Sequence, residues 1–259
     1  MLPAPFILIA PASRGLSLAL TRHYLRNTKF PVYATHRSDS PDSIRKTMLA
    51  DLPTVDPARL NLLKLELTSE ESVSNAAETL SSMLPNKDAY MHTAFFTGGV
   101  LHPERRPGDL NASTLQETFN VNVISHLLLT KHFSRFLPRT TQLQGLEPAK
   151  WVHVSARVGS ISDNHLGGWF SYRASKAALN QVIRTFDLYL QAQKTPAMCV
   201  GVHPGTVKTD LSKEFWSGVP KEKLFEPEYA AERLFEVVNG LEENQRGRIW
   251  DWAGKEVLP

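Results

Sequence analysis

The chain has 259 residues, of which 42% are hydrophobic and 21% charged, values close to those of ordinary globular proteins. This length suits one large α/β domain or two small ones. Its 29 Lys and Arg residues and 26 Asp and Glu residues leave a net charge of +3, and the basic residues are scattered, so we expect no nucleic-acid partner.

Two features bear on where the protein works. The single cysteine, Cys199, excludes an intramolecular disulfide framework and stands in an apolar run, where we expect a buried thiol in a reducing compartment. No apolar run approaches the ~20 residues of a membrane helix. Residues 1–5 include no basic residue, and the apolar stretch that follows is too short for a signal peptide. We therefore expect a cytoplasmic protein without a membrane partner.

Short apolar runs alternate with longer amphipathic stretches along the whole chain. The apolar runs predict strands, in chain order, at 6–10, 31–35, 60–67, 89–96, 151–155, 197–202 and 248–252. Helical patterns separate them at 16–25, 44–50, 70–84, 113–137 and 172–193, and a last helix begins at Pro227, a position that proline tolerates. The alternation predicts right-handed βαβ crossovers. We expect a single doubly wound (Rossmann) α/β domain over residues 1–259, with about seven parallel strands and helices on both faces.

In such sheets ligands bind beyond the carboxyl ends of the strands, so the turns there are candidate sites. Residues 10–17, Ala-Pro-Ala-Ser-Arg-Gly-Leu-Ser, follow the first strand and lead into a helix. Small residues there would let backbone N–H groups and the helix N-terminus approach a pyrophosphate. The candidate dinucleotide-binding residues are Ser13, Arg14, Gly15, Leu16 and Ser17, although a plain strand-to-helix turn explains them equally well.

A basic residue, Arg37, follows the second strand. NAD-preferring dinucleotide folds place an acid near this point for the ribose 2′-hydroxyl, whereas an arginine accommodates a 2′-phosphate. Either Arg37 or Arg14 alone is more often a surface charge. Together they favour NADP(H) as the cofactor.

The strongest signal is residues 171–180, Ser-Tyr-Arg-Ala-Ser-Lys-Ala-Ala-Leu-Asn. Tyr172 and Lys176 are four apart, which puts them on one face of a helix. A phenol with a pKa near 10 is a poor acid–base group at neutral pH, and a nearby ammonium is expected to lower that pKa. Tyr172 would then protonate a carbonyl oxygen as hydride reaches the carbon. An ordinary helix face is the alternative for this spacing by itself.

With these motifs in this order, the sequence resembles the short-chain dehydrogenase/reductase family from Phe6 to about Ala253. Residues 10–17 resemble its Thr-Gly-x-x-x-Gly-x-Gly turn, with proline and serine in place of the first and third glycines. Residues 96–99, Phe-Thr-Gly-Gly, stand where the family usually has Asn-Asn-Ala-Gly. Residues 101–103, 159–161 and 167–169 are similar to the branch of C-factor-like and sniffer-like carbonyl reductases.

The resemblance implies further contacts with the cofactor. Glu66 and Leu67 would flank the adenine, and Gly98 and Gly99 would lie along the nicotinamide ribose. The segment that follows the sixth strand would hold the carboxamide through Pro204, Gly205, Val207 and Thr209. His203, directly before that segment, is interpreted as structural.

The resemblance also implies an asparagine relay and a catalytic serine. Asn122 would bond a main-chain carbonyl and hold a water in a proton relay with Lys176, unless it is simply a locally satisfied polar residue. The family's Ser-Ser-x-x-Gly motif reads Ser-Ala-Arg-Val-Gly at 155–159, so Ala156 occupies the position of the serine that bonds the substrate oxygen. Ser155 and Ser160 are equally weighted replacements, and loss of one such donor typically costs ~10²–10³ in rate.

These residues predict an NADPH-dependent oxidoreductase that reduces a ketone, an aldehyde or an imine, or oxidises the matching alcohol. Residues 206–226 would bind the substrate, and the apolar side chains expected around it favour an apolar or aromatic compound: Leu211, Phe215, Trp216, Trp169 and Phe170. The helices at 113–137 and 172–193 would pair subunits in a homodimer or homotetramer. The alternative is a dinucleotide-binding protein with little catalysis, which senses redox state or serves a partner.

Overall fold

The computed structural model describes residues 4–139 and 147–259, so the first three residues weighed above for a signal peptide lie outside it. Its centre is an eight-stranded sheet in the order β10-β9-β6-β5-β4-β1-β2-β3. Seven strands are parallel: β1 (Ala4–Ala10), β2 (Val32–His36), β3 (Leu60–Lys64), β4 (Ala89–Phe96), β5 (Ala149–Val154), β6 (Ala197–His203) and β9 (Ile249–Asp251). The eighth, β10 (Glu256–Val257), is antiparallel to β9 at the edge. The predicted doubly wound sheet is confirmed, with this short edge strand added.

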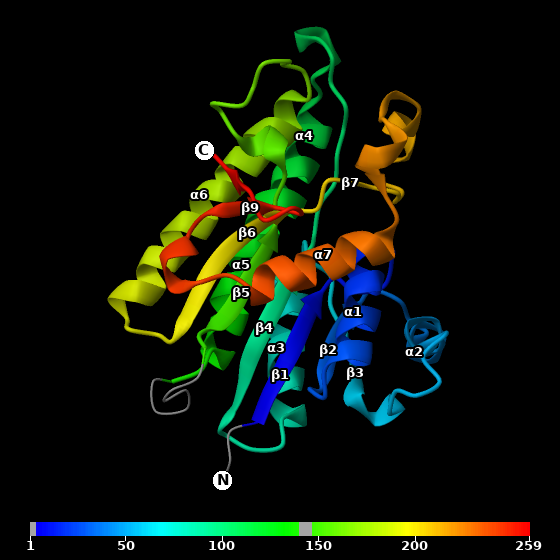
Figure 1. Ribbon diagram of the computed structural model, residues 1–259, viewed down its shortest axis with the longest axis vertical. Helices are drawn as coiled ribbons and strands as arrows, with labels where there is room; N and C mark the ends of the chain where they lie inside the picture. Colours follow the sequence, from blue (N-terminus) through cyan, green and yellow to red (C-terminus); the bar gives the residue numbers. More distant parts are fainter. Residues whose placement is uncertain (1–3, 140–146) are drawn as a thin grey trace.

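Helices cover both faces of the sheet (Figure 1). One face carries α1 (Gly15–Asn27), α2 (Pro41–Leu49) and α7 (Pro227–Asn239), and the other carries α3 (Glu70–Met83), α4 (Ala112–Phe119), α5 (Ser125–Phe133) and α6 (Phe170–Ala192). Successive strand residues point to opposite faces, so Ile7 and Ile9 pack under the first set while Phe6 and Leu8 pack under the second. Both faces of the sheet are therefore buried, as the continuous apolar runs predict.

The helix expected over 113–137 is not continuous. A π-helical turn, Asn120–Ile124, separates α4 from α5, and a 3₁₀ turn, Ser134–Phe136, ends the second helix. A π turn fits one extra residue into the helix, and such turns are frequent at functional sites. Here the turn contains Asn122, whose side chain is fully buried. The prediction of one regular helix was wrong at this point because apolar periodicity does not register a single inserted residue.

The carboxyl ends of the parallel strands meet at one edge, and the long connections after β4, β5 and β6 gather there (Figure 1). The connection after β6 contains β7 (Thr206–Val207) and β8 (Leu224–Phe225), which pair with each other. Cys199, in the middle of β6, is buried as expected. Within residues 4–139 and 147–259, no helix has both the length and the apolarity needed to span a membrane.

Candidate active site

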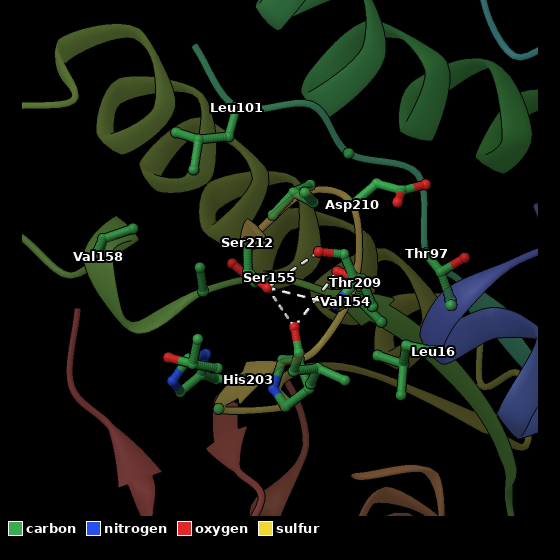
Figure 2. A pocket seen from close by; sticks show the side chains of 18 of the residues that line it. Leu16, Thr97, Leu101, Val154, Ser155, Val158, His203, Thr209, Asp210 and Ser212 are labelled. Atoms are coloured by element: carbon green, nitrogen blue, oxygen red, sulfur yellow. Dashed lines mark hydrogen bonds between the residues drawn. The ribbon is translucent and has the colours of Figure 1, made fainter. Parts of the chain in front are cut away.

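A cavity of about 660 Å³ lies at this edge (Figure 2). That volume is in the range of small-molecule and cofactor sites. The cavity brings together twelve of the predicted site residues: Arg14, Gly15, Leu16, Ser17, Gly99, Ser155, Tyr172, Lys176, Pro204, Gly205, Val207 and Thr209. Its lining does not include the remaining seven: Ser13, Arg37, Glu66, Leu67, Gly98, Asn122 and Ser160.

The first turn and the segment after β6 approach each other closely at Gly15. Its φ is +53°, in the left-handed region that favours glycine, and a Cβ at this position would lie 2.9 Å from Cγ2 of Thr209. Neither the backbone conformation nor the space therefore suits a larger residue. Gly15, the one glycine that the turn shares with the family motif, is the residue that lets the two sides of the cavity meet.

Sequence reasoning missed Thr97, which lines the cavity between the first turn and the end of β4. Its hydroxyl donates to the main-chain oxygen of Pro11 at 2.9 Å. A hydroxyl has one proton, so the 2.7 Å contact between Ser17 and Thr97 is a hydrogen bond donated by Ser17. Thr97 stands in the segment where the family usually has asparagines, and its hydroxyl links the end of β4 to the turn of residues 10–17. Its place in residues 96–99 was the available signal.

The two arginines assigned to the cofactor lie in exposed ion pairs. Arg37 Nη1 is 3.4 Å from Glu66 Oε2, and Arg14 Nη1 is 3.7 Å from Asp210 Oδ2. The Arg37 and Arg14 side chains are 65% and 74% exposed. Exposed pairs of this kind contribute about 0–1 kcal/mol. Both guanidinium groups can therefore turn to a phosphate at little cost.

Tyr172 and Lys176 lie together on α6, and both are buried. Lys176 Nζ is 5.7 Å from the centre of the Tyr172 ring and donates to the main-chain oxygen of Val154 at 2.9 Å. The connection after β5 packs directly on this part of the helix, since a Cβ on Gly159 would lie 2.8 Å from the carbonyl carbon of Lys176. The predicted pair thus lies on the part of α6 that packs against the end of β5 and the connection after it.

The expected lowering of the Tyr172 pKa is not found. Burial raises the pKa of Tyr172 to about 12 and lowers the pKa of Lys176 to about 8. The prediction was wrong because burial disfavours the charged form of each group. At neutral pH the phenol is protonated, which is the form that donates a proton to a carbonyl oxygen.

The side chain of Asn122 forms hydrogen bonds with the loop after β4 and with α6. Its Oδ1 accepts from the N–H of Val100 at 2.8 Å, and its Nδ2 donates to Val100 O and to Ser175 Oγ, each at 3.0 Å. The implied bond to a main-chain carbonyl is therefore present. The role of Asn122 in a water relay stays a prediction.

Neither serine weighed as a replacement at Ala156 directs its proton into the cavity. Ser155 lines the cavity, but its hydroxyl donates to Asn180 Oδ1 at 2.6 Å. Ser160 lies outside the lining, where its Oγ accepts from the N–H of Asp163 at 3.0 Å and lies 3.3 Å from Ser162 Oγ. Only the methyl group of Ala156 is left where the family has its hydroxyl.

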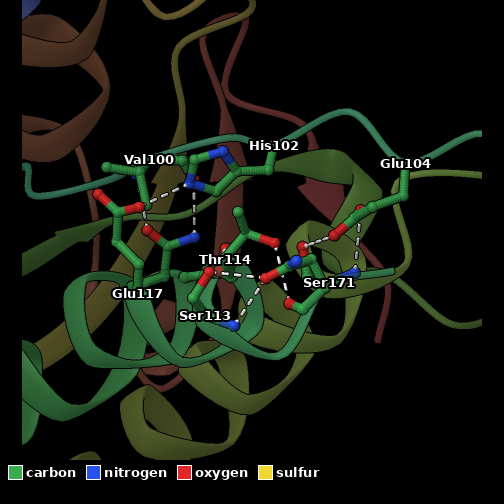
Figure 3. Close-up of polar contacts among 10 residues, drawn as sticks. Val100, His102, Glu104, Ser113, Thr114, Glu117 and Ser171 are labelled. Carbon is green, nitrogen blue, oxygen red and sulfur yellow. Dashed lines mark hydrogen bonds and ion pairs between the residues drawn. The ribbon is translucent and has the colours of Figure 1, made fainter. Parts of the chain in front are cut away.

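A buried carboxylate, also missed from the sequence, holds the start of α6 (Figure 3). Glu104 is 3% exposed, and its carboxylate accepts from the N–H of Ser171 at 3.3 Å and from the Ser171 hydroxyl. Its main-chain oxygen accepts from the N–H of Trp169 at 2.6 Å. Negative charge at a helix N-terminus is favourable. Glu104 therefore joins the loop after β4 to the helix one residue before Tyr172.

We expect Glu104→Ala to lower the free energy of unfolding by about 1–3 kcal/mol, because it leaves the buried Ser171 donors without an acceptor. Urea denaturation measures this change. The control is Glu117→Ala, which removes a more exposed carboxylate that contacts His102 on the surface and is expected to change stability by less than about 0.5 kcal/mol. Equal losses in the two variants would show that Glu104 is an ordinary surface acid.

The apolar walls predicted for the substrate are present in part. Leu211, Phe215 and Trp169 line the cavity, and the rings of Trp169 and Phe215 are 4.8 Å apart. Trp216 does not line it, and its indole N–H donates to Ser212 Oγ. Phe170 does not line it either and is 41% exposed. The prediction that these two residues line the cavity was wrong, because the Trp216 indole is hydrogen-bonded to Ser212 and the Phe170 side chain is exposed.

A parallel sheet with a cavity at its carboxyl edge is the architecture of dinucleotide-binding α/β proteins. The family model for short chain dehydrogenase matches residues 5–219. The chain therefore belongs to the short-chain dehydrogenase family. A similar protein, 1-hydroxy-2-glutathionyl-2-methyl-3-butene dehydrogenase of Rhodococcus sp. (strain AD45), is 30% identical over 244 residues, 94% of each chain. C-signal of Myxococcus xanthus is 33% identical over 153 residues, 58% of this chain and 81% of its own.

Solved structures with the same fold include two carbonyl reductases. The carbonyl reductase Sniffer of D. melanogaster matches with a TM-score of 0.83 and 22% identity, over 99% of this chain and 100% of that one. The NADPH-bound carbonyl reductase from chicken fatty liver matches with a TM-score of 0.83 and 25% identity, over 100% of both chains. These neighbours agree with the branch that residues 101–103, 159–161 and 167–169 indicate.

Proposed function

We propose that this protein is an NADPH-dependent reductase of ketones and aldehydes with Tyr172 as the proton donor. The observation that carries the proposal is the buried phenol of Tyr172 on the wall of the cavity, beside Lys176 and in the same cavity as the turn of residues 10–17. NADPH would supply the hydride to the carbonyl carbon. Tyr172 would give its proton to the carbonyl oxygen, and Lys176 would stabilise the phenolate that remains.

The residues around the cavity fit a dinucleotide. Gly15, the first residue of α1, has a left-handed backbone conformation and lines the cavity. A pyrophosphate bound there would meet the N-terminus of this helix. Gly99 leaves room beside the reactive pair, since a Cβ there would lie 3.7 Å from Lys176 Nζ and 3.8 Å from Asn122 Oδ1. Arg14 and Arg37 would hold the 2′-phosphate. The preference for NADP(H) is further supported by the NADPH-bound chicken enzyme.

Arg37→Ala is expected to raise the Kd for NADPH about 10–100-fold and to leave the Kd for NADH unchanged, because a charge-assisted hydrogen bond contributes about 1.5–3 kcal/mol. Quenching of tryptophan fluorescence by each cofactor measures both constants. Arg106→Ala, which removes an exposed arginine from a remote loop, is the control. Equal effects on NADPH and NADH would contradict the assignment of Arg37 to the 2′-phosphate.

The substrate proposed here is an apolar or aromatic carbonyl compound held within residues 206–226, because Leu211, Phe215 and Trp169 wall the cavity. NADPH oxidation by the purified protein, assayed with a panel of aliphatic and aromatic ketones and aldehydes, tests the proposed activity. Turnover with none of them would contradict it.

The second candidate is a dinucleotide-binding protein with little catalysis. The commitment of Ser155 to Asn180 and the methyl group of Ala156 favour it, because they remove the usual second contact to a substrate oxygen. NADPH binding without turnover would support this candidate against the reductase.

We also propose that subunits pair through the helices at 113–137 and 172–193. Support comes from large apolar side chains that these helices leave exposed, Ile124 and Leu127 on one and Leu188 and Tyr189 on the other. Sedimentation velocity distinguishes a homodimer or homotetramer from a monomer. The proposed location of the protein is the cytoplasm, on the ground that its single cysteine fits a reducing compartment.

A further inference from the structure

The cavity has Tyr172 as a proton donor for a substrate oxygen, while several of the hydroxyl groups around it donate their protons elsewhere. A carbonyl oxygen gains negative charge as hydride arrives, and a second donor aimed at it is typically worth ~10²–10³ in rate. The Ser155 proton is committed to Asn180, and Ser160 lies outside the cavity. The Thr97 and Ser212 hydroxyls line the cavity but donate to main-chain oxygens of Pro11 and Val207.

His203 differs from these groups. It is the last residue of β6, and its side chain lines the cavity (Figure 2). Tyr172 and Ala156 line the same cavity. Within residues 4–139 and 147–259, no group forms a hydrogen bond with its imidazole. By contrast, the buried imidazoles of His126 and His153 bond each other, the Gly98 oxygen and the Trp151 indole.

The pairing of β5 with β6 brings His203 beside the missing serine. Val154 pairs with Val202, and the N–H of Ser155 donates to Val202 O at 2.8 Å. His203, the residue after Val202, is still paired with Asp251 of β9 and therefore lies on the strand beside the Ser155–Ala156 peptide. His203 and Ala156 both line the cavity, so the imidazole reaches it from the strand next to the one that carries Ala156.

The His203 imidazole is in a charge state that lets it donate a hydrogen bond and keep its proton. Burial, with smaller effects from Arg157 and Lys176, lowers the pKa of His203 to about 4, although Asp251 acts in the opposite direction. At neutral pH the ring is uncharged and carries one N–H. Neutral imidazoles polarise substrate carbonyls in this way in other enzymes.

We propose that His203 donates the second hydrogen bond to the substrate carbonyl oxygen, in the place that Ala156 leaves open. The inference rests on the proposed reductase function. In the reduction, the carbon receives hydride from NADPH, the oxygen receives the Tyr172 proton, and the C=O π bond becomes a C–H and an O–H bond. His203 keeps its proton throughout, so it stabilises the charge on the oxygen without changing the stoichiometry.

The test compares His203→Phe, which keeps a ring but removes the donor, with His203→Gln, which keeps an N–H. With the best carbonyl compound of the panel, we expect His203→Phe to lower kcat ~10²–10³-fold and His203→Gln to recover at least about tenfold of that loss. The KM for NADPH should stay within about threefold of wild type, which also reports that the variants are folded. His165→Phe, at an exposed loop position, is the control.

Repeating the substitution in an Ala156→Ser variant tests whether His203 acts in place of the missing serine. Ala156→Ser restores a hydroxyl at the family's position, so His203→Phe should cost less than about tenfold when it is combined with Ala156→Ser. An unchanged kcat in His203→Phe, equal losses in His203→Phe and His203→Gln, or the same loss in both backgrounds would overturn the proposal. If wild type turns over and Tyr172→Phe does not, these outcomes leave the reductase function standing. No turnover by wild type would overturn both.

Discussion

Tyr172→Phe is expected to lower kcat for carbonyl reduction by about 10²–10⁴-fold, the usual contribution of a positioned acid–base group. The change removes one oxygen from a buried side chain and keeps the ring that lies 5.7 Å from Lys176 Nζ. The affinity for NADPH should therefore stay within about twofold. Stopped-flow or steady-state oxidation of NADPH gives the rate, and fluorescence titration gives the affinity.

The matched control is Tyr229→Phe on α7, where the tyrosine is exposed. It should leave kcat unchanged. If wild type and Tyr172→Phe bind NADPH equally and share the same negligible rate, the protein is a dinucleotide-binding protein and not a reductase. Comparable turnover in the two proteins would instead assign the proton to another group.

Lys176→Met is expected to reduce turnover by a similar factor and, unusually, to change how stability depends on pH. In the unfolded chain the Lys176 ammonium has an ordinary pKa of 10.5, whereas burial lowers that pKa to about 8 in the folded protein. Between pH 8 and 10.5 the unfolded chain therefore binds more protons than the folded one. Stability from this group rises with pH across that window.

Below pH 8 the folded protein carries a buried ammonium at a cost on the order of 3 kcal/mol, the free-energy equivalent of the change in pKa. Methionine is unbranched like lysine and only one atom shorter, and it carries no charge. The unfolding free energy of wild type, relative to that of Lys176→Met, should thus increase as the pH rises from 8 to 10.5. Urea denaturation of both proteins at pH 7, 8, 9 and 10 measures the difference.

The control for loss of a positive charge is Lys29→Met, because Lys29 is exposed and its charge is not desolvated. A constant difference between wild type and Lys176→Met over the whole pH range would mean that the ammonium is not paying a burial penalty. Full turnover by Lys176→Met would separately remove the lysine from the catalytic pair.

Much of the architecture is predictable because it depends on local patterns. The apolar runs at 6–10 and 197–202 are continuous, a pattern typical of parallel strands that are buried on both faces. The spacing of Tyr172 and Lys176 puts them on one helix face whatever surrounds them. Irregular backbone near the pair is not predictable in this way. The π turn at Asn120–Ile124 depends on one inserted residue, and a periodic pattern of apolar residues does not reveal a single insertion.

The details of the site depend on contacts between segments far apart in the sequence. Glu104 and Ser171 are 67 positions apart, and Ser17 and Thr97 are 80 apart. No local pattern records such pairs. The same holds for the direction of a hydroxyl: Ser155 looks available in the sequence, yet packing of β5 against α6 gives its proton to Asn180.

The sequence by itself therefore determined the class of fold, the edge of the sheet at which the site lies, and the tyrosine–lysine pair at its centre. These follow from periodicity and from spacing along one helix. Only the tertiary structure decided the protonation of that pair, because burial raises the pKa of Tyr172 and lowers the pKa of Lys176. It also decided which polar groups remain to meet a substrate, since a side chain's hydrogen bonds are fixed by neighbours that the chain brings together only when it folds.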